Sequence, residues 1–120
     1  MSYGEIQTKG YEDLRQYIKD NWEYISLRDE DDTEVVRLDP SDERVEWKDF
    51  DVEDQELVLE VTVRGDDGDI PTPTTFKYSE LYKTGSGGDT LSRREITETA
   101  VEEDDDEMTI RHAIQVPKVD

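Results

Sequence analysis

The sequence contains no cysteine, and this absence excludes several kinds of structure and site. Without thiols the chain can form neither a disulfide nor a thiolate metal site. It has a single histidine, and no apolar run approaches the ~18 residues of a membrane-spanning helix. Its first ten residues also lack the basic-then-apolar order of a signal peptide. We therefore expect no membrane segment and no secretory leader.

Acidic residues dominate what is present: 34 Asp and Glu against 14 Lys and Arg give a net charge of −20. Such a charge often marks a disordered chain, but here the carboxylates alternate with apolar residues, and ten aromatic residues can supply a core. We interpret the acidity as an adaptation to concentrated salt, since the Debye length falls to about 3 Å at 1 M salt and self-repulsion is screened. This predicts a halophilic archaeal source. The alternative is a nucleic-acid mimic that faces a basic partner.

The same charge opposes binding to nucleic acid. Affinity for nucleic acid comes largely from Lys and Arg side chains that neutralise phosphates. The only adjacent basic pair in this chain is Arg93-Arg94, and acidic residues surround it. We expect neither a nucleic acid nor a membrane as a partner.

One helix is predicted near the start of the chain, over residues 10–21. Its apolar residues recur at helical spacing: Tyr11, Leu14, Ile18 and Trp22. Thr8 is a candidate N-cap and Asn21 a candidate end. We expect the apolar stripe to face the protein core.

Seven strands are predicted after the helix, from period-two alternation and from turn residues. They cover residues 23–28, 34–39, 44–50, 56–64, 74–82, 90–102 and 108–116. Acidic or glycine-rich turns separate them, and no linker is long enough to divide the chain. The predicted fold class is α+β, mainly β. One N-terminal helix packs on an antiparallel sheet or small β-sandwich, within a single domain of residues 1–120.

No catalytic residue is predicted. His112 alternates in phase with apolar residues, which favours a hydrogen-bonded core residue over a general base. Nucleophilic catalysis also needs a nucleophile with a base in reach, and no serine lies in a Gly-x-Ser-x-Gly context. Composition alone does not exclude a pair of carboxylates that catalyses glycoside hydrolysis. No carboxylate, however, stands in an apolar stretch of sequence that would raise its pKa. We expect a protein that is not an enzyme.

No metal or cofactor site is predicted either. An EF-hand loop needs Gly at its sixth position and Glu at its twelfth, whereas the acidic run that starts at Asp29 has Glu34 and Pro40 there. The glycine-rich stretch 85–90 lacks the lysine of a phosphate-binding Walker sequence. We interpret the acidic turns as solvated tips.

The segment Glu80-Leu81-Tyr82-Lys83-Thr84-Gly85-Ser86-Gly87-Gly88-Asp89-Thr90-Leu91-Ser92 resembles a pattern found in structural proteins of tailed viruses. In these proteins a strand that ends in Leu-Tyr leads into a Gly-Gly loop, then to Leu and a small residue. The later stretch Asp106-Glu107-Met108-Thr109-Ile110, with Val116-Pro117, is similar to their closing strand. The resemblance covers residues 76–117.

This resemblance implies a β-rich virion component, such as a capsid accessory, tail or fibre module, with no catalytic residue. The expected partners are other virion proteins or further copies of the chain. The expected location is a virion assembled in a high-salt archaeal cytoplasm. The alternative is a cytoplasmic, haloarchaeal protein-binding domain. The candidate interaction residues are Gly85, Gly87, Gly88, Leu91, Arg93 and Arg94.

Overall fold

The computed structural model describes residues 2–48 and 50–117. In this part of the chain one helix precedes seven strands, which form two antiparallel sheets. The elements are α1 (Thr8–Asn21), β1 (Tyr24–Asp29), β2 (Glu34–Leu38), β3 (Val45–Trp47), β4 (Glu56–Arg64), β5 (Thr74–Tyr82), β6 (Ser92–Val101) and β7 (Glu107–Gln115). The predicted fold class, α+β and mainly β with an N-terminal helix, is confirmed.

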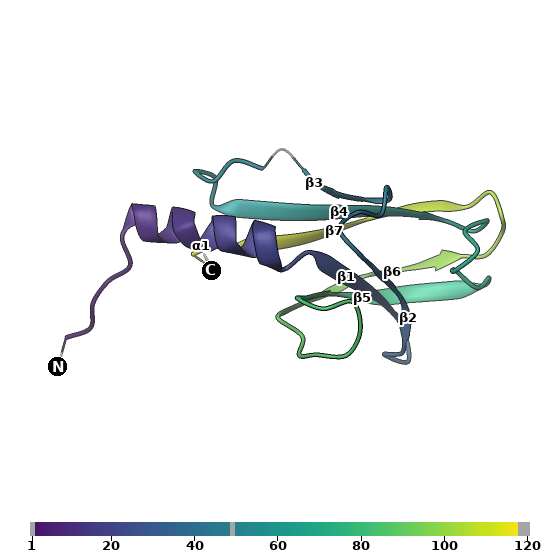
Figure 1. The fold of residues 1–120 in the computed structure, drawn as a ribbon. Helices are drawn as coiled ribbons and strands as arrows, with labels where there is room; N and C mark the ends of the chain where they lie inside the picture. The colour runs from purple at the N-terminus through teal and green to yellow at the C-terminus, as the bar shows by residue number, and fades with distance from the viewer. Residues whose placement is uncertain (1, 49, 118–120) are drawn as a thin grey trace.

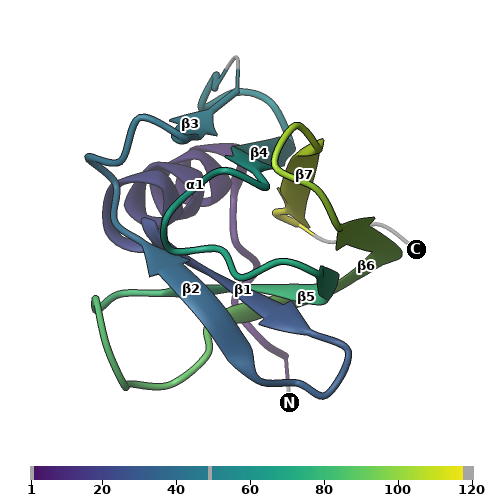
Figure 2. The same cartoon turned by 90° about the vertical axis from the view of Figure 1, so that its right-hand side faces the viewer.

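The two sheets face each other as a sandwich (Figure 2). Sheet A has the strand order β2-β1-β5-β6, and sheet B has the order β3-β4-β7. The chain passes from one sheet to the other after β2, after β4 and after β6. The acidic segment after β6 therefore joins the two sheets, whereas the one after β1 is the tip of a hairpin.

The core lies between the sheets because each strand sends alternate side chains inward. In β4 these are Leu59, Val61 and Val63, and the Cα partner of Val61 in β7 is Ile110. Sheet A supplies residues of the same cluster, among them the fully buried Phe76 of β5. Burial of this apolar surface is the main term that stabilises such a sandwich.

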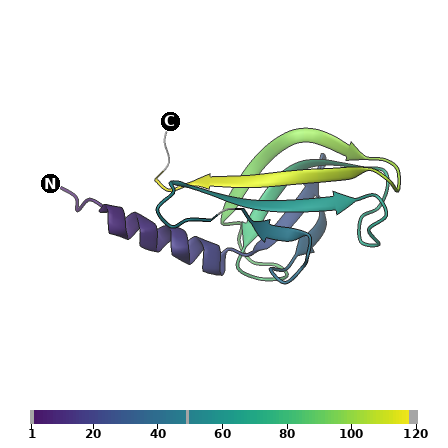
Figure 3. The same cartoon turned by 90° about the horizontal axis from the view of Figure 1, so that it is seen from above.

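The helix lies at one end of the sandwich and lengthens the molecule (Figures 1 and 3). The overall dimensions are 55 × 28 × 26 Å. α1 begins at Thr8, two residues before the predicted start, and Gln7 is its N-cap without a side-chain hydrogen bond. The prediction that Thr8 caps the helix is therefore wrong, because Thr8 already has a place in the first helical turn.

The predicted strand boundaries agree best where strands are long and lie inside a sheet. β4 and β5 match the predicted ranges 56–64 and 74–82. The predicted strand 44–50 is longer than β3, which is an edge strand of three residues, and residue 49 of that range lies outside the described residues. An edge strand has a partner on one side only, so its ends are not fixed by alternation.

The predicted core stripe of the helix is wrong at one position. Leu14 is exposed, and Arg15 is buried in its place beside Ile18. Nε of Arg15 donates to the carbonyl oxygen of Val52 at 2.8 Å, and Nη1 donates to that of Val116. Because these carbonyls lie at the end of sheet B, the helix turns its arginine toward the sandwich and leaves Leu14 outside.

Candidate functional site

The glycine-rich loop of residues 83–91 connects β5 to β6 and contains four of the candidate interaction residues (Figure 1). Arg37 of β2 holds this loop, since its Nη1 donates to the carbonyl oxygens of Thr84 at 3.1 Å and Gly87 at 2.7 Å. Gly87 and Gly88 have positive φ angles of 63° and 77°, a region that glycine adopts without strain. The glycines therefore shape a loop that is tied to sheet A.

A cluster of arginines, tyrosines and carboxylates covers the outer face of sheet A beside this loop. Glu80 is 3% exposed, and its carboxylate accepts from the hydroxyl of Tyr82 at 2.7 Å and from Nη1 of Arg93 at 3.0 Å. Nη1 of Arg28 lies 3.4 Å from the same carboxylate. A buried charge needs such partners because desolvation is costly. Arg93 is thus already engaged within the chain.

Stacking adds to the order of this cluster. The guanidinium of Arg37 lies 3.6 Å from the ring centroid of Tyr82, and that of Arg93 lies 3.9 Å from the centroid of Tyr78. Hydrogen bonds from Arg93 and Arg28 also hold the pKa of Asp32 below its ordinary value. The outer face of sheet A is therefore a closed network, in which each cation has a partner.

The structure separates the candidate residues Arg93 and Arg94. Arg93 lies on the outer face of sheet A, whereas Nη1 of Arg94 donates to the backbone carbonyl of Arg111 in β7. Adjacent residues of a strand point to opposite faces, so the pair cannot form one basic patch. Leu91 is half-buried, and its backbone N–H bonds the carbonyl of Leu81 at 2.9 Å.

His112 lies fully buried between the two sheets. Its Nδ1 is 2.7 Å from Oγ of Ser79 and its Nε2 is 2.8 Å from Oγ of Ser92, so both ring nitrogens are bonded. Burial, and then the nearby charge of Arg94, lower its pKa to about 4. Within the described residues no carboxylate hydrogen-bonds the ring. The neutral imidazole acts here as a polar link between sheets.

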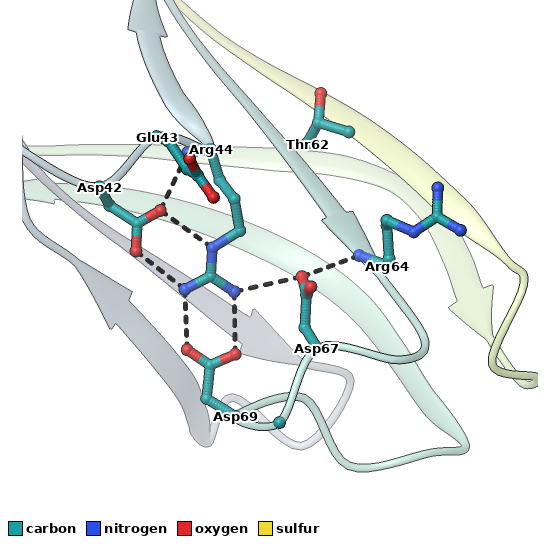
Figure 4. Close-up of a pocket in the computed structure, with 8 residues that line it drawn as sticks. Asp42, Glu43, Arg44, Thr62, Arg64, Asp67 and Asp69 are labelled. Carbon is teal, nitrogen blue, oxygen red and sulfur yellow. Dashed lines mark hydrogen bonds and ion pairs between the residues drawn. The ribbon is translucent and has the colours of Figure 1, made fainter.

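A cleft of about 690 Å³ lies beside Arg44, on the connection between β2 and β3 (Figure 4). The guanidinium meets three carboxylates: Asp69 in a two-pronged pair at 2.8 Å, Asp42 at 2.9 and 3.0 Å, and Asp67 at 3.2 Å. All five N–H donors of an arginine are used. Hydrogen bonds from Arg44 lower the pKa values of Asp42 and Asp69.

The side chains of this cleft act as a clamp, which means that they link two segments of the chain to each other. Arg44 keeps no donor for an anionic ligand, and the carboxylates around it already share its charge. The clamp ties the β2–β3 connection to the turn after β4 (Figure 4). Across residues 2–48 and 50–117, no group of three or more histidines and carboxylates is placed to hold a metal ion.

The edge strands of the sheets have features that oppose pairing with a strand of another molecule. β6 carries a register irregularity opposite Phe76 and Tyr78, and charged side chains line it. The neighbouring edge strand β7 has a backbone carbonyl occupied by Arg94. Bulges, charges and short length are the usual devices that prevent edge pairing. We find no long, regular, apolar edge among the described strands.

Exposed apolar side chains gather instead at the start of the chain. The large hydrophobic residues that are exposed in the described part of the protein are Tyr3 (84%), Ile6 (52%), Leu14 (41%) and Tyr17 (47%). We call these four residues the N-terminal apolar surface. All of them lie within the first 17 residues, in α1 or just before it. No other part of the described chain exposes large hydrophobic side chains.

Sequence reasoning missed this surface, although a signal for it existed. The helix carries apolar residues in two stripes, one with Ile18 and one with Leu14 and Tyr17. A helix that lies on a sandwich buries one face only. Two apolar stripes therefore leave one stripe in solvent, and the sequence does not say which.

Comparison with models of protein families, with curated proteins and with solved structures finds no match to this chain. Among the described residues, no helix has both the length and the apolar character that crossing a lipid bilayer requires.

Proposed function

We propose that this protein is a non-enzymatic structural component that acts through protein–protein contacts, and that the N-terminal apolar surface is its main contact site. The observation that carries the proposal is the position of the exposed hydrophobic side chains. In a chain of net charge −20, the large ones gather in one short segment. Exposed apolar patches mark interaction sites in soluble proteins, and Leu14 and Tyr17 are neighbours on one face of α1, since they are three positions apart.

The polar groups in and around the sandwich already have partners within the chain, and this supports a structural role. His112 is neutral and bonded on both sides, Arg44 is saturated by carboxylates, and Glu80 is paired with arginines. Each group stabilises the sandwich with the interactions it already makes. Catalysis would need a group with an unused donor or acceptor in a cleft that a substrate can enter.

The setting we propose is the virion of a tailed virus of halophilic archaea. Two features of the sequence support it: the resemblance of residues 76–117 to structural proteins of tailed viruses, and the acidity of the chain. A virion protein needs a stable β-rich body and surfaces that contact neighbouring subunits. Its partners would be further copies of itself or other virion proteins. It would be assembled in a cytoplasm of high salt.

Sedimentation velocity in about 3 M KCl, where surface charge is screened, tests the assembly function. The proposal predicts species larger than the 14.0 kDa chain, with a population that rises with protein concentration. A single monomeric species at every concentration up to about 1 mM would contradict it.

A further inference from the structure

Three parallel stripes run along α1, each with residues spaced by four, three and four positions. The inner stripe faces the sandwich and consists of Tyr11, Arg15, Ile18 and Trp22. The outer stripe consists of Gly10, Leu14, Tyr17 and Asn21. The third, which we call the rim, consists of Lys9, Asp13, Gln16 and Asp20. Successive residues of a helix are about 100° apart, so the rim borders the outer stripe.

The outer stripe is held in place before any partner arrives. Nζ of Lys83 donates to the hydroxyl of Tyr17 at 2.7 Å and lies 5.0 Å from the centroid of its ring. Nδ2 of Asn21 donates to the carbonyl oxygen of Tyr17 at 2.9 Å. Arg15 fixes the helix from behind, through the carbonyls of Val52 and Val116. Groups that are already ordered lose less entropy on binding.

The rim has a cation at one end and a carboxylate at the other. When two copies of the helix lie side by side in opposite directions, the rim of one copy meets the rim of the other. Lys9 then lies opposite Asp20, and Asp13 lies opposite Gln16. Each pair occurs twice in the dimer. No like charges meet in this alignment. Lys9 lies 3.2 Å from the carboxylate of Glu12, which is almost buried, whereas Asp20 lies 3.8 Å from Lys19 and accepts from Nε2 of Gln16 at 3.0 Å. An ammonium group has three N–H donors, so Lys9 can keep its contact with Glu12 and also bond Asp20 of a second helix. The pair of Asp20 with Lys19 is exposed and contributes little.

We propose that the outer stripe of α1 docks antiparallel on the same stripe of a second copy of the chain, which forms a two-fold symmetric dimer. Leu14 of one copy packs against Tyr17 of the other, and Lys9 of one copy pairs with Asp20 of the other. A two-fold interface requires a surface that complements itself, and the rim meets this condition. This inference rests on the assembly function proposed above and names its partner.

The net charge distinguishes a second copy from a basic partner. Two chains of −20 repel each other in dilute buffer, and salt removes this repulsion while it strengthens apolar contact. The dimer should therefore tighten as salt rises. A complex with a basic segment would weaken under the same change, since its attraction is screened.

The test uses the full chain and sedimentation equilibrium in about 3 M KCl. Leu14→Glu adds a carboxylate in the centre of the outer stripe, and Thr97→Glu adds one at an exposed position of β6 as a matched control. We expect Leu14→Glu to raise the dimer dissociation constant about tenfold or more. The control should leave it unchanged. Circular dichroism shows that each variant is folded.

A charge exchange tests the antiparallel direction. Lys9→Asp and Asp20→Lys each place like charges together and should weaken the dimer, whereas the double variant K9D/D20K restores both pairs between copies. Because Lys9→Asp also removes the partner of Glu12 within the chain, circular dichroism must first show that each variant is as folded as the wild type. This part uses the lowest salt concentration at which the chain stays folded, because salt screens the pairs. A double variant as weak as the single variants overturns the antiparallel alignment.

The outcomes separate the inference from the function on which it rests. If assemblies persist equally in Leu14→Glu and in the control, the helix interface is overturned and the assembly function stands with another surface. If the wild-type chain remains a monomer at all concentrations, both are overturned. If the dimer weakens as salt rises, attraction between charges holds it together, and the apolar contact through the outer stripe is overturned.

Discussion

The guanidinium of Arg15 in α1 and the backbone carbonyl of Val116 after β7 are joined by a hydrogen bond across 101 positions of sequence. The same side chain bonds the carbonyl of Val52 at 2.8 Å. Through these two contacts the helix is attached to the end of sheet B. Together with the buried side chain of Ile18, this buried cation turns one face of the helix toward the sandwich and leaves Leu14 exposed.

Replacing Arg15 by Ala should therefore loosen the helix. Two carbonyl oxygens lose a charged donor, which costs about 2–3 kcal/mol of unfolding free energy. Arg111→Ala is a matched control, because its guanidinium pairs with Glu60 at an exposed site, where the loss is about 0.5 kcal/mol. Chemical denaturation in high salt measures both. Equal losses in the two variants would show that Arg15 does not hold the helix.

Two glycines in one turn give a second prediction, on the connection between the sheets. A Cβ on Gly65 would collide with the carbonyl oxygen of Glu103, whereas a Cβ on Gly68 meets no atom within 4 Å. We expect Gly65→Ala to destabilise the protein by about 1–3 kcal/mol. Gly68→Ala should change stability by less than about 1 kcal/mol. Melting temperatures that fall equally in both would contradict the close contact at Gly65.

The pKa of His112 predicts how stability depends on pH. It is lowered to about 4 in the folded chain from an ordinary 6.5, so between these values the unfolded chain binds a proton that the folded chain does not. Stability contributed by His112 is then complete above about pH 6.5 and is lost as pH falls toward 4. Since a tenfold change in proton affinity is worth about 1.4 kcal/mol, the loss reaches about 3 kcal/mol.

The measurement is the free energy of unfolding against pH for the wild type and for His112→Gln. Carboxylates titrate in both proteins, so the difference between the two curves isolates the histidine. The variant should be less stable at pH 7 and should have the flatter curve between pH 4 and 6.5. Parallel curves would mean that the imidazole is accessible to protons in the folded chain.

Salt should stabilise the fold itself. With 34 carboxylates among 120 residues, self-repulsion is strong in dilute buffer and is screened as the Debye length shortens. We expect the melting temperature to rise steadily between about 0.1 M and 3 M KCl. Far-UV circular dichroism measures the melting temperature at each salt concentration. A constant melting temperature would remove the argument for adaptation to salt. The nucleic-acid mimic would then be the better explanation of the acidity.

The sequence predicts the strands well where alternation is strong, as in β4, where Leu57, Leu59, Val61 and Val63 share one face. It does not predict which sheet each strand joins, because alternation is the same on either side of a core. The β4 and β7 pairing, for example, depends on contacts between distant segments. Local pattern therefore determines the elements, and long-range packing determines their partners.

The candidate site was harder to predict. Arg93 and Arg94 are adjacent in a predicted strand, so their opposite directions follow from the period of two. The burial of Arg15 had no such signal, because its partners are backbone carbonyls that no side chain in the sequence reveals. The hydrophobic pattern assigns Leu14 to the core. Its exposure follows only from the tertiary contacts of the neighbouring Arg15 with backbone carbonyls.

The dimer through α1 is the central claim, and cross-linking tests it most directly because the chain has no cysteine of its own. Lys9→Cys and Asp20→Cys are made separately, mixed in about 3 M KCl and treated with a bismaleimide of about 10 Å reach, which matches the spacing of packed helices. The antiparallel dimer predicts a product of twice the chain mass from the mixture and little from either variant alone. No product from the mixture, or equal product from Lys9→Cys alone, would contradict it.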